Sequence, residues 1–386
     1  MQIEMTTATS PTLPRAGGRG SRLGLRLPAM LARFPRHGRA CPGHPQENVR
    51  GVDARNKRGH DVRYVLRIIV SVLICAIFFA PPAHAYKAYV SNEKGNSITI
   101  IDTDKLEAIA TVRVGRRPRG IALNKDGSEL YICAGDDDAI QVLDTKTLKV
   151  TGKLPSGPDP ELLALSPNGN IIYVSNENDN LVTLIDVKKK EMIGDIPVGV
   201  EPEGMAVSPD GKLLVNTSET TNMAHLIDTQ SKEIVANILV DGRPRFAEFK
   251  NDGSELWVSS EVGGTVAIID PVKRELKQKI GFDIPAMSKE AIQPIGISIT
   301  RDGKRAFVAL GPANRVAVID AETKKIEKYL LVGQRVWHLA FTLDEKYLLT
   351  ANGVSNDVSV IDVASLKVLK SIPVGAFPWG VVVAPQ

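Results

Sequence analysis

Seven positions at one spacing carry most of the side chains in this sequence that could do chemistry. Each lies 17 residues after a recurring aspartate, or 25 in one case, and the set is Arg119, Glu161, Glu203, Arg245, Ile295, Trp337 and Trp379. A position kept only for geometry would hold similar residues, whereas this one varies in charge and size, as a binding surface on a fixed scaffold does. We predict that these positions, with the adjacent His338, form a ligand-binding site.

A second set of polar residues has its own fixed spacing. Nine residues before four of the aspartates stand glutamates, namely Glu93, Glu177, Glu219 and Glu261. One interpretation makes them solvated loop charges paired with neighbours. The other makes them part of a polar site, opposed by Arg119 and Arg245 and floored by Trp337 and Trp379.

Catalytic constellations are sparse. After residue 85 the sequence has two histidines, His225 in a strand pattern and His338, so a His-rich metal site is excluded and a Ser-His-acid triad would need an unplaced serine. The glutamates could hold Ca²⁺, but no EF-hand-like loop accompanies them. We therefore predict no catalytic residue, no metal and no cofactor, and we favour a non-catalytic protein over an enzyme.

The elements that position these residues come from a repeat. The recurring aspartates are Asp102, Asp144, Asp186, Asp228, Asp270, Asp320 and Asp362, with gaps of 42, 42, 42, 42, 50 and 42 residues. One unit reads as four short Val/Ile/Leu-rich strands, over residues 203–209, 212–218, 223–229 and 233–240. Asp-Gly or Asn-Gly pairs supply hairpin turns, and a proline in six units fixes φ at the crossing to the next unit.

Four-stranded units of about 40 residues predict a β-propeller. The chain ends 24 residues after Asp362, inside a unit whose next strand pattern stands at residues 85–93. We predict an all-β, seven-bladed β-propeller of four-stranded antiparallel blades, closed by a 1+3 clasp between C-terminal and N-terminal strands. The eight extra residues fall in segment 282–293, where Phe282, Ile284 and Met287 suggest a lid or docking edge, with an ornamental surface loop as the alternative.

The first 85 residues have a different composition from the rest. Of 48 Lys+Arg and 44 Asp+Glu, they hold 13 and 4, which leaves 35 and 40 for residues 86–386 and removes the electrostatic argument for nucleic acid. We predict that residues 1–62 are a disordered leader or a mis-annotated N-terminal extension. Residues 63–85, with Arg63, Arg67 and an apolar run ending at Ala83-His84-Ala85, predict a signal peptide cut after Ala85.

The third domain expected from this division is the propeller, residues 86–386. The cysteine content is consistent with export, because only Cys133 lies beyond residue 85. Cys133 stands in the strand pattern "LYICAG", which indicates a buried thiol. We expect a periplasmic protein, monomeric and without a stable membrane anchor after cleavage.

The repeat "YVSNENDNLVTLIDVKKKEMIGDIPVGVEPEGMAVSPDGK" resembles the YVTN-type repeat of periplasmic, YncE-like β-propellers, and the resemblance covers essentially residues 86–386. The signal peptide, the seven units and the ending also resemble the β-propeller family associated with PQQ-dependent alcohol catabolism. That resemblance implies an accessory role beside quinoprotein oxidation, with a periplasmic quinoprotein dehydrogenase or cytochrome as possible partner. We therefore expect binding of such a protein, or of a small ligand, at the mouth of the central channel. A lactonase-like hydrolase on the same scaffold is the alternative.

Overall fold

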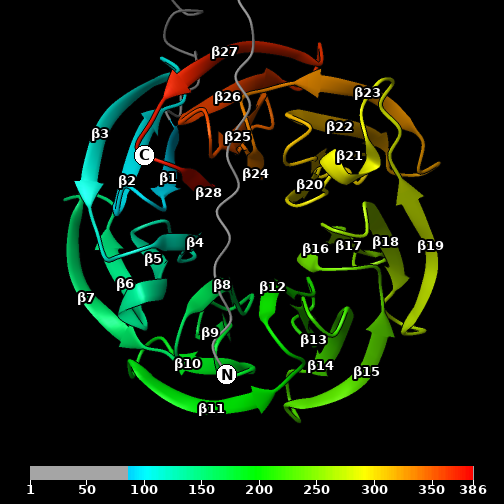
Figure 1. Ribbon diagram of the computed structural model, residues 1–386. Helices are drawn as coiled ribbons and strands as arrows, with labels where there is room; N and C mark the ends of the chain where they lie inside the picture. Colours follow the sequence, from blue (N-terminus) through cyan, green and yellow to red (C-terminus); the bar gives the residue numbers. More distant parts are fainter. Residues whose placement is uncertain (1–85, 386) are drawn as a thin grey trace, which may run out of the picture. The chain divides into compact units, whose positions relative to one another are not determined.

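The structure, a computed structural model, describes residues 86–385, and these form a ring of seven four-stranded antiparallel sheets (Figure 1). The seven-bladed propeller predicted from the repeat is therefore confirmed. The predicted leader, signal peptide and cleavage site lie outside the described residues. In the part of the chain that the structure describes, no helix has the length and apolar character to cross a membrane.

The blades follow one another around the ring in chain order. The first four contain β28 (Pro378–Pro385), β1 (Tyr86–Asn92), β2 (Ser97–Asp102) and β3 (Glu107–Arg113); β4 (Pro118–Leu123), β5 (Glu129–Ala134), β6 (Ala139–Asp144) and β7 (Lys149–Pro155); β8 (Pro160–Leu165), β9 (Ile171–Asn176), β10 (Leu181–Asp186) and β11 (Glu191–Pro197); and β12 (Pro202–Val207), β13 (Leu213–Ser218), β14 (Met223–Asp228) and β15 (Glu233–Leu239).

The other three contain β16 (Pro244–Phe249), β17 (Leu256–Ser260), β18 (Thr265–Asp270) and β19 (Glu275–Gly281); β20 (Ile297–Ile299), β21 (Arg305–Ala309), β22 (Arg315–Asp320) and β23 (Ile326–Leu331); and β24 (Val336–Phe341), β25 (Tyr347–Asn352), β26 (Asp357–Asp362) and β27 (Lys367–Pro373). Two short 3₁₀ turns, η1 (Gly135–Asp137) and η2 (Lys289–Ala291), interrupt the loops. The first strand of each blade lies nearest the central axis and the fourth lies on the rim (Figure 1).

The ring closes through β28, as predicted. This C-terminal strand pairs antiparallel with β1, in a register running from Tyr86 opposite Pro385 to Asn92 opposite Pro378. The sheet order β28-β1-β2-β3 is thus the expected 1+3 clasp. Because the last strand of the chain completes the blade that the first three begin, the ring has no open gap where two unpaired edges would meet water.

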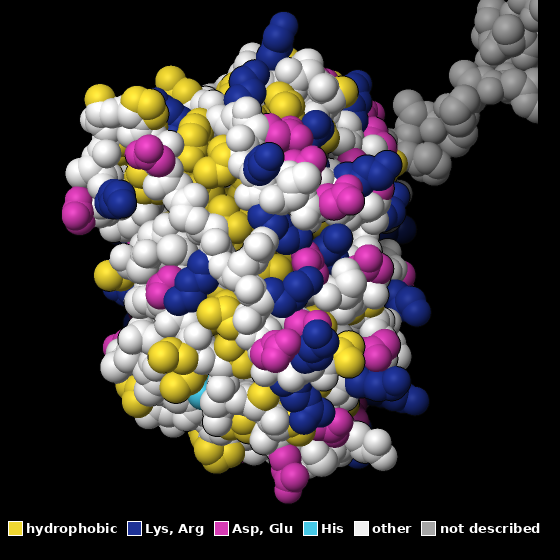
Figure 2. All heavy atoms as spheres, turned by 90° about the vertical axis from the view of Figure 1, so that its right-hand side faces the viewer, with side chains coloured by type: hydrophobic (Ala, Val, Ile, Leu, Met, Phe, Trp, Pro, Cys, Tyr) yellow, Lys and Arg dark blue, Asp and Glu magenta, His cyan; other side chains and the backbone are white. Residues whose placement is uncertain are grey.

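The apolar core lies between the blades. The middle strands are buried on both faces, as in β2, where every residue is buried, because each sheet is covered by its two neighbours. Rim strands such as β7 and β19 are mostly exposed and carry lysines. Figure 2 shows the side of the ring near β19 and β23, with basic and acidic side chains interspersed among apolar ones. Charge on these edge strands disfavours pairing with a second molecule.

The repeated aspartates close the same turn in every blade. In all seven, the carboxylate accepts a hydrogen bond from the backbone N–H three residues later, at distances of 2.6–2.9 Å for Lys105, Thr147, Lys189, Ser231, Lys273, Thr323 and Ser365. These aspartates therefore initiate the turn between the third and fourth strands of each blade. The Asp-Gly and Asn-Gly glycines also adopt the expected positive φ, 74° at Gly127 for example.

A second hydrogen bond, which the sequence analysis missed, holds the crossings between blades. In six blades an Asn or Asp in the loop after the second strand adopts a left-handed conformation and accepts the N–H of the residue 21 positions later, just before the crossing proline or Val336. The pairs are Asn96 and Arg117, Asp138 and Asp159, Asn180 and Glu201, Asn222 and Arg243, Asn314 and Arg335, and Asn356 and Phe377. We call this bond the crossing latch. It sets where each inner strand begins.

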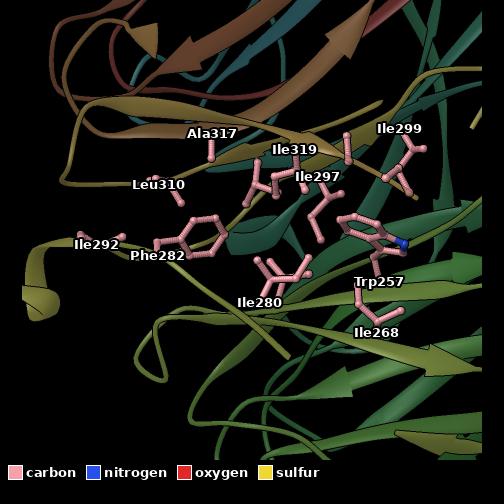
Figure 3. Packing of buried hydrophobic residues seen from close by; sticks show 14 of the residues in the cluster. Trp257, Ile268, Ile280, Phe282, Ile292, Ile297, Ile299, Leu310, Ala317 and Ile319 are labelled. Atoms are coloured by element: carbon pink, nitrogen blue, oxygen red, sulfur yellow. The ribbon is translucent and has the colours of Figure 1, made fainter. Parts of the chain in front are cut away.

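The remaining blade has Gly264 in place of the latching Asn, and its crossing is the one that carries the insertion. Here apolar packing replaces the latch. Phe282, Ile284 and Ile292 are buried in a cluster with Ile280 and residues of the next blade such as Leu310 (Figure 3). The hypothesis of a lid with apolar residues free to meet a ligand is therefore wrong for Phe282 and Ile284, because the fold already buries them.

This packing predicts a stability role for the insertion. We expect Phe282→Ala to lower the free energy of unfolding by about 3 kcal/mol, since it removes a buried ring and leaves a cavity between two blades. Urea unfolding followed by circular dichroism measures the change. The control is Lys289→Ala on the exposed side of the same loop, which should stay within about 0.5 kcal/mol of the wild type. Equal stability of the two variants would contradict this packing role.

Candidate functional site

The predicted site residues gather at one end of the central channel, where the inner strands begin. We call this end the mouth. The second-ring glutamates lie beside the crossings, because the backbone N–H groups of Glu177, Glu219 and Glu261 donate to the carbonyls of the residues that precede the crossing prolines, at 2.8–3.0 Å. Glu93 does the same across the clasp, to the carbonyl of Phe377 at 2.9 Å. The two columns therefore share one face, as expected.

Hydroxyl groups of the neighbouring blade fix the backbone of the mouth. Ser91 donates to the Arg119 carbonyl at 2.6 Å, Ser175 to that of Glu203 at 2.7 Å, and Ser259 to that of Ile295 at 2.6 Å. Cys133 occupies the matching position of another blade and is fully buried, so the predicted buried thiol is confirmed. Burial raises the pKa of this thiol well above its usual range.

One side of the mouth is an ion-pair cluster around Arg119. Its guanidinium contacts Glu93 at 3.1 Å and Glu161, which is fully buried. Arg117 reaches the other oxygen of Glu161 at 3.1 Å and also pairs with Asp159. Burial of Glu161 makes its pairs costly to break, since a lone buried charge has no solvent to stabilise it.

The opposite side is a second cluster around Arg245. This guanidinium, only 5% exposed, contacts Glu219, Glu261 at 3.3 Å and Glu203 at 3.4 Å. Arg243 adds contacts to Glu219 at 2.7 Å and to Glu261 at 3.4 Å, with nearly half of its side chain exposed. The mouth therefore has one deeply buried arginine, Arg245, the partly buried Arg117 and Arg119, and the more accessible Arg243 and Arg335.

The two tryptophans lie under these guanidinium groups. Arg119 lies 5.7 Å from the Trp379 ring centroid, while Arg245 and Arg335 lie 5.5 and 4.5 Å from that of Trp337. Such cation–π contacts add to the ion pairs. Glu93, Glu219 and Glu261 are thus paired with arginines, as one interpretation held, whereas Glu177 forms no salt bridge with a described residue. Glu219 and Glu261 are buried rather than solvated, and arginines cover the aromatic rings that the other interpretation placed at the floor of the site.

A layer of larger side chains closes the channel just below. His338, expected at the mouth, lies in this layer, with its ring 4.1 Å from Trp379 and 5.1 Å from Phe246, centroid to centroid. Leu162 and Phe246 occupy the same position in two other blades, and the remaining four have glycine there. A Cβ on one of these glycines, Gly120, would come within 2.4 Å of the Glu161 carbonyl oxygen, so the backbones of neighbouring inner strands approach closely at this position.

Charge and burial together shift the pKa values of the mouth. Burial, only partly offset by Arg245, raises the pKa of Glu203 well above its usual range, and burial with a hydrogen bond to Glu161 raises the pKa of Glu177 to about 7. For Glu161, burial is outweighed by Arg119, so its pKa is lowered. Burial, aided by the charges of Arg245 and Arg119, lowers the pKa of His338 to about 3, and the ring is neutral at ordinary pH.

Three arginines of the mouth escaped the sequence analysis. Arg117, Arg243 and Arg335 stand two positions before the analysed column, on the residue that the crossing latch holds. The sequence does contain a signal for them, because the position two residues before the analysed column also varies in charge. It holds Arg, Asp, Glu, Gln and Phe around the ring. Among the analysed positions, Ile295 alone adds only apolar surface, packing with Trp337 and Trp379.

Two further groups were considered for chemistry. His225 has a structural environment, because its Nε2 accepts the Gly199 N–H at 3.0 Å and its Nδ1 lies 2.6 Å from the Asn237 side-chain oxygen. Carboxylate oxygens of Asp159, Glu161 and Glu177 converge within 4.8 Å, a spacing that suits a metal ion. Arg117 and Arg119 already contact this group, so positive charge is supplied there by the protein itself.

Comparison with known proteins supports the fold more than a specific family. A family described as the Choice-of-anchor I domain matches residues 180–359, less than half of the chain. No curated protein matches.

Several solved structures share the architecture. The chain is similar to Kuenenia stuttgartiensis hydrazine synthase, with 22% identity, a TM-score of 0.63, and coverage of 70% of this chain and 95% of that one. It is also similar to a putative 6-phosphogluconolactonase of Bacteroides fragilis, with 19% identity, a TM-score of 0.67, and coverage of 79% and 99%. At these identities the similarity shows a propeller fold and leaves activity open.

The buried cluster predicts a large effect of losing Arg245. We expect Arg245→Met to destabilise the protein by about 3–5 kcal/mol, since buried Glu203, Glu219 and Glu261 would lose a shared partner. Arg243→Met is the matched control, and its exposed position should limit the loss to about 1 kcal/mol. Equal losses in urea unfolding would mean that burial does not separate the two arginines.

The raised pKa of Glu177 predicts a pH dependence. Between the unfolded pKa of about 4.3 and the folded value of about 7, the native state keeps a proton that the unfolded chain loses. Stability therefore decreases as pH rises through this window. We expect Glu177→Gln to reduce the decline between pH 5 and 8, measured by urea unfolding, while Glu322→Gln on an exposed turn leaves it unchanged. An identical decline in all three proteins would contradict the assignment.

Proposed function

We propose that this protein is a non-catalytic, periplasmic binding module that recognises a partner protein through the mouth, as an accessory of PQQ-dependent alcohol oxidation. The observation that carries the proposal is the pre-organised mouth. Reciprocal ion pairs hold its inner arginines, while Arg243 and Arg335 keep 48% and 30% of their side chains exposed. A surface ordered before binding loses little conformational entropy in a complex.

The composition of the mouth also suits a protein partner. Exposed valines, Val200, Val262 and Val354, lie in loops of the same face, around the arginines. Arginine and tryptophan are enriched where protein interfaces concentrate their binding energy, and apolar side chains next to them exclude water. The buried state of Trp337 and Trp379 favours recognition by the outer arginines over direct stacking on the indoles.

The chemistry of the mouth gives less support to catalysis. No described residue forms a hydrogen bond with His338 Nε2, and the ring is buried under Trp379. A general base must lie within hydrogen-bond reach of the proton it takes, directly or through one water. The strongest acids of the mouth are engaged by arginines, which are poor partners for a carboxylate that has to accept a proton.

The pathway and compartment rest on the sequence. Residues 63–85 resemble a signal peptide, and the repeat resembles those of periplasmic propellers associated with quinoprotein oxidation. A quinoprotein alcohol dehydrogenase and its cytochrome are therefore the partners to test.

The test is a binding titration with these two proteins from the same organism. Biolayer interferometry should detect one of them binding to the purified propeller protein, and Arg335→Glu should weaken that binding about 10-fold by reversing an exposed charge of the mouth. Lys304→Glu reverses a charge on a turn of the opposite face and should leave affinity unchanged. Absence of binding, or equal loss in both variants, would refute the proposed partner or the proposed surface.

The lactonase alternative is tested on the same preparation. We expect no turnover of sugar lactones above the rate in buffer. Turnover that disappears in Glu203→Gln or His338→Ala would overturn the non-catalytic assignment.

A further inference from the structure

The channel contains a second candidate site, away from the mouth. Below the layer of Leu162, Phe246 and His338 lies a cavity of about 430 Å³. On β28 its wall extends from Trp379 down to Val383, toward the far end of the channel. Its volume lies within the range of sites that hold small organic molecules, and its wall is mainly apolar.

One acidic side chain interrupts this wall. Glu248 on β16 lines the cavity. The equivalent positions of the other six inner strands hold small residues without charge, namely Ala122, Ala164, Ala206, Ser298, Ala340 and Val382. The other blades show which residues the backbone accepts at this position. Alanine satisfies the backbone geometry at this position in four blades, so the fold does not require a carboxylate in the fifth.

Glu248 has no partner among the described residues. The salt bridges and side-chain hydrogen bonds of residues 86–385 include none to its carboxylate, in contrast to the paired glutamates of the mouth such as Glu161, Glu219 and Glu261. Burial alone raises its pKa to about 8. Glu248 is half-buried, so its carboxyl group remains accessible from the cavity, and the apolar surroundings without a counter-ion disfavour its charged form.

Two other polar atoms of the wall are also unpaired. The Nε2 of His338 and the Nε1–H of Trp379 are buried and form no hydrogen bond with described residues. Both residues line the cavity, and Trp379 is 1% exposed while His338 is 6% exposed. These two atoms are sealed from solvent and are not available to a ligand, so the cavity offers one carboxyl group and the aromatic rings of Phe246 and Trp379.

We propose that this cavity binds a small organic cation, a protonated alkylamine or arylamine whose ammonium group pairs with Glu248 while its apolar part packs against Phe246 and Trp379. An anion is disfavoured because the lining residues include no lysine or arginine to pair with it. A hard metal ion is disfavoured because it needs several oxygen ligands, and the wall offers one carboxylate. The aromatic rings favour an organic cation further through cation–π attraction. The site is independent of the function proposed for the mouth.

Binding of the amine should displace a proton from the protein into the buffer, and this release can be measured. Near pH 7 the Glu248 carboxyl is largely protonated, whereas the amine arrives as an ammonium ion. Formation of the ion pair requires Glu248 to release its proton to the buffer. Among the residues that line the cavity, His338 is the other titratable one, and its lowered pKa keeps it neutral in both states. Binding should therefore release close to one proton per ligand.

The experiment is calorimetric titration of the purified protein with benzylamine and with its neutral analogue benzyl alcohol. At pH 7, in two buffers of different ionisation enthalpy, benzylamine should bind with proton release, and benzyl alcohol should bind at least about 10-fold more weakly. The substitution Glu248→Gln should lower the affinity for benzylamine by a similar factor and abolish the proton release. Ala340→Leu, which narrows the cavity and keeps the carboxyl group, should weaken both probes. Glu322→Gln, on an exposed turn, should change neither.

Several outcomes would overturn the proposal. These are no benzylamine binding at millimolar concentration, equal affinity for the amine and the alcohol, or unchanged amine binding in Glu248→Gln. Thermal unfolding of each variant checks that it is folded. If Ala340→Leu fails to fold, the proton release of the wild type against Glu248→Gln decides the matter, because Gln has nearly the shape of Glu and removes only the charge.

Discussion

The crossing latch is the interaction on which the arrangement of the mouth of this propeller depends. A left-handed Asn or Asp in the loop after each second strand accepts the N–H of the residue that precedes the next inner strand, in six of seven blades. Since that N–H belongs to the residue beside the mouth, the latch positions the mouth side chains as well as the blade. The residues it holds, such as Arg117 and Arg243, are themselves part of the ion-pair clusters. The same hydrogen bond therefore sets both the start of the inner strand and the position of the arginines at the mouth.

The mouth illustrates how buried charge is balanced in a fold of this kind. Its carboxyl groups outnumber its arginines, and the excess is absorbed by the raised pKa values of Glu177 and Glu203. Arginine suits this position because its planar fork can contact several carboxylates at once, as Arg245 does. The resulting network fixes side-chain orientation at the cost of desolvation.

The two halves of the channel differ in physical character. The mouth is closed by paired charges over two indoles, whereas the other half is an apolar cavity with a single unpaired carboxyl group at Glu248. His338 and Trp379 separate the halves and leave buried polar atoms without partners. The insertion does not cover either half with free apolar residues, because Phe282 and Ile284 are committed to the packing of neighbouring blades (Figure 3).

The sequence by itself determined the seven blades, the turn aspartates, the clasp of β28 with β1 and the gathering of two residue columns on one face. These features follow from periodic spacing, since identical units place equivalent residues at equivalent points of a closed ring. Only the tertiary structure decided which charges meet, because Arg119 and Glu161 come from adjacent blades, and Arg335 reaches Glu261 across 74 residues of chain. Only the tertiary structure shows that Phe282 is buried and that Glu248 lines a mainly apolar cavity. Pairing and burial depend on the distances between blades and on the directions of side chains, and neither is encoded in the spacing of a repeat.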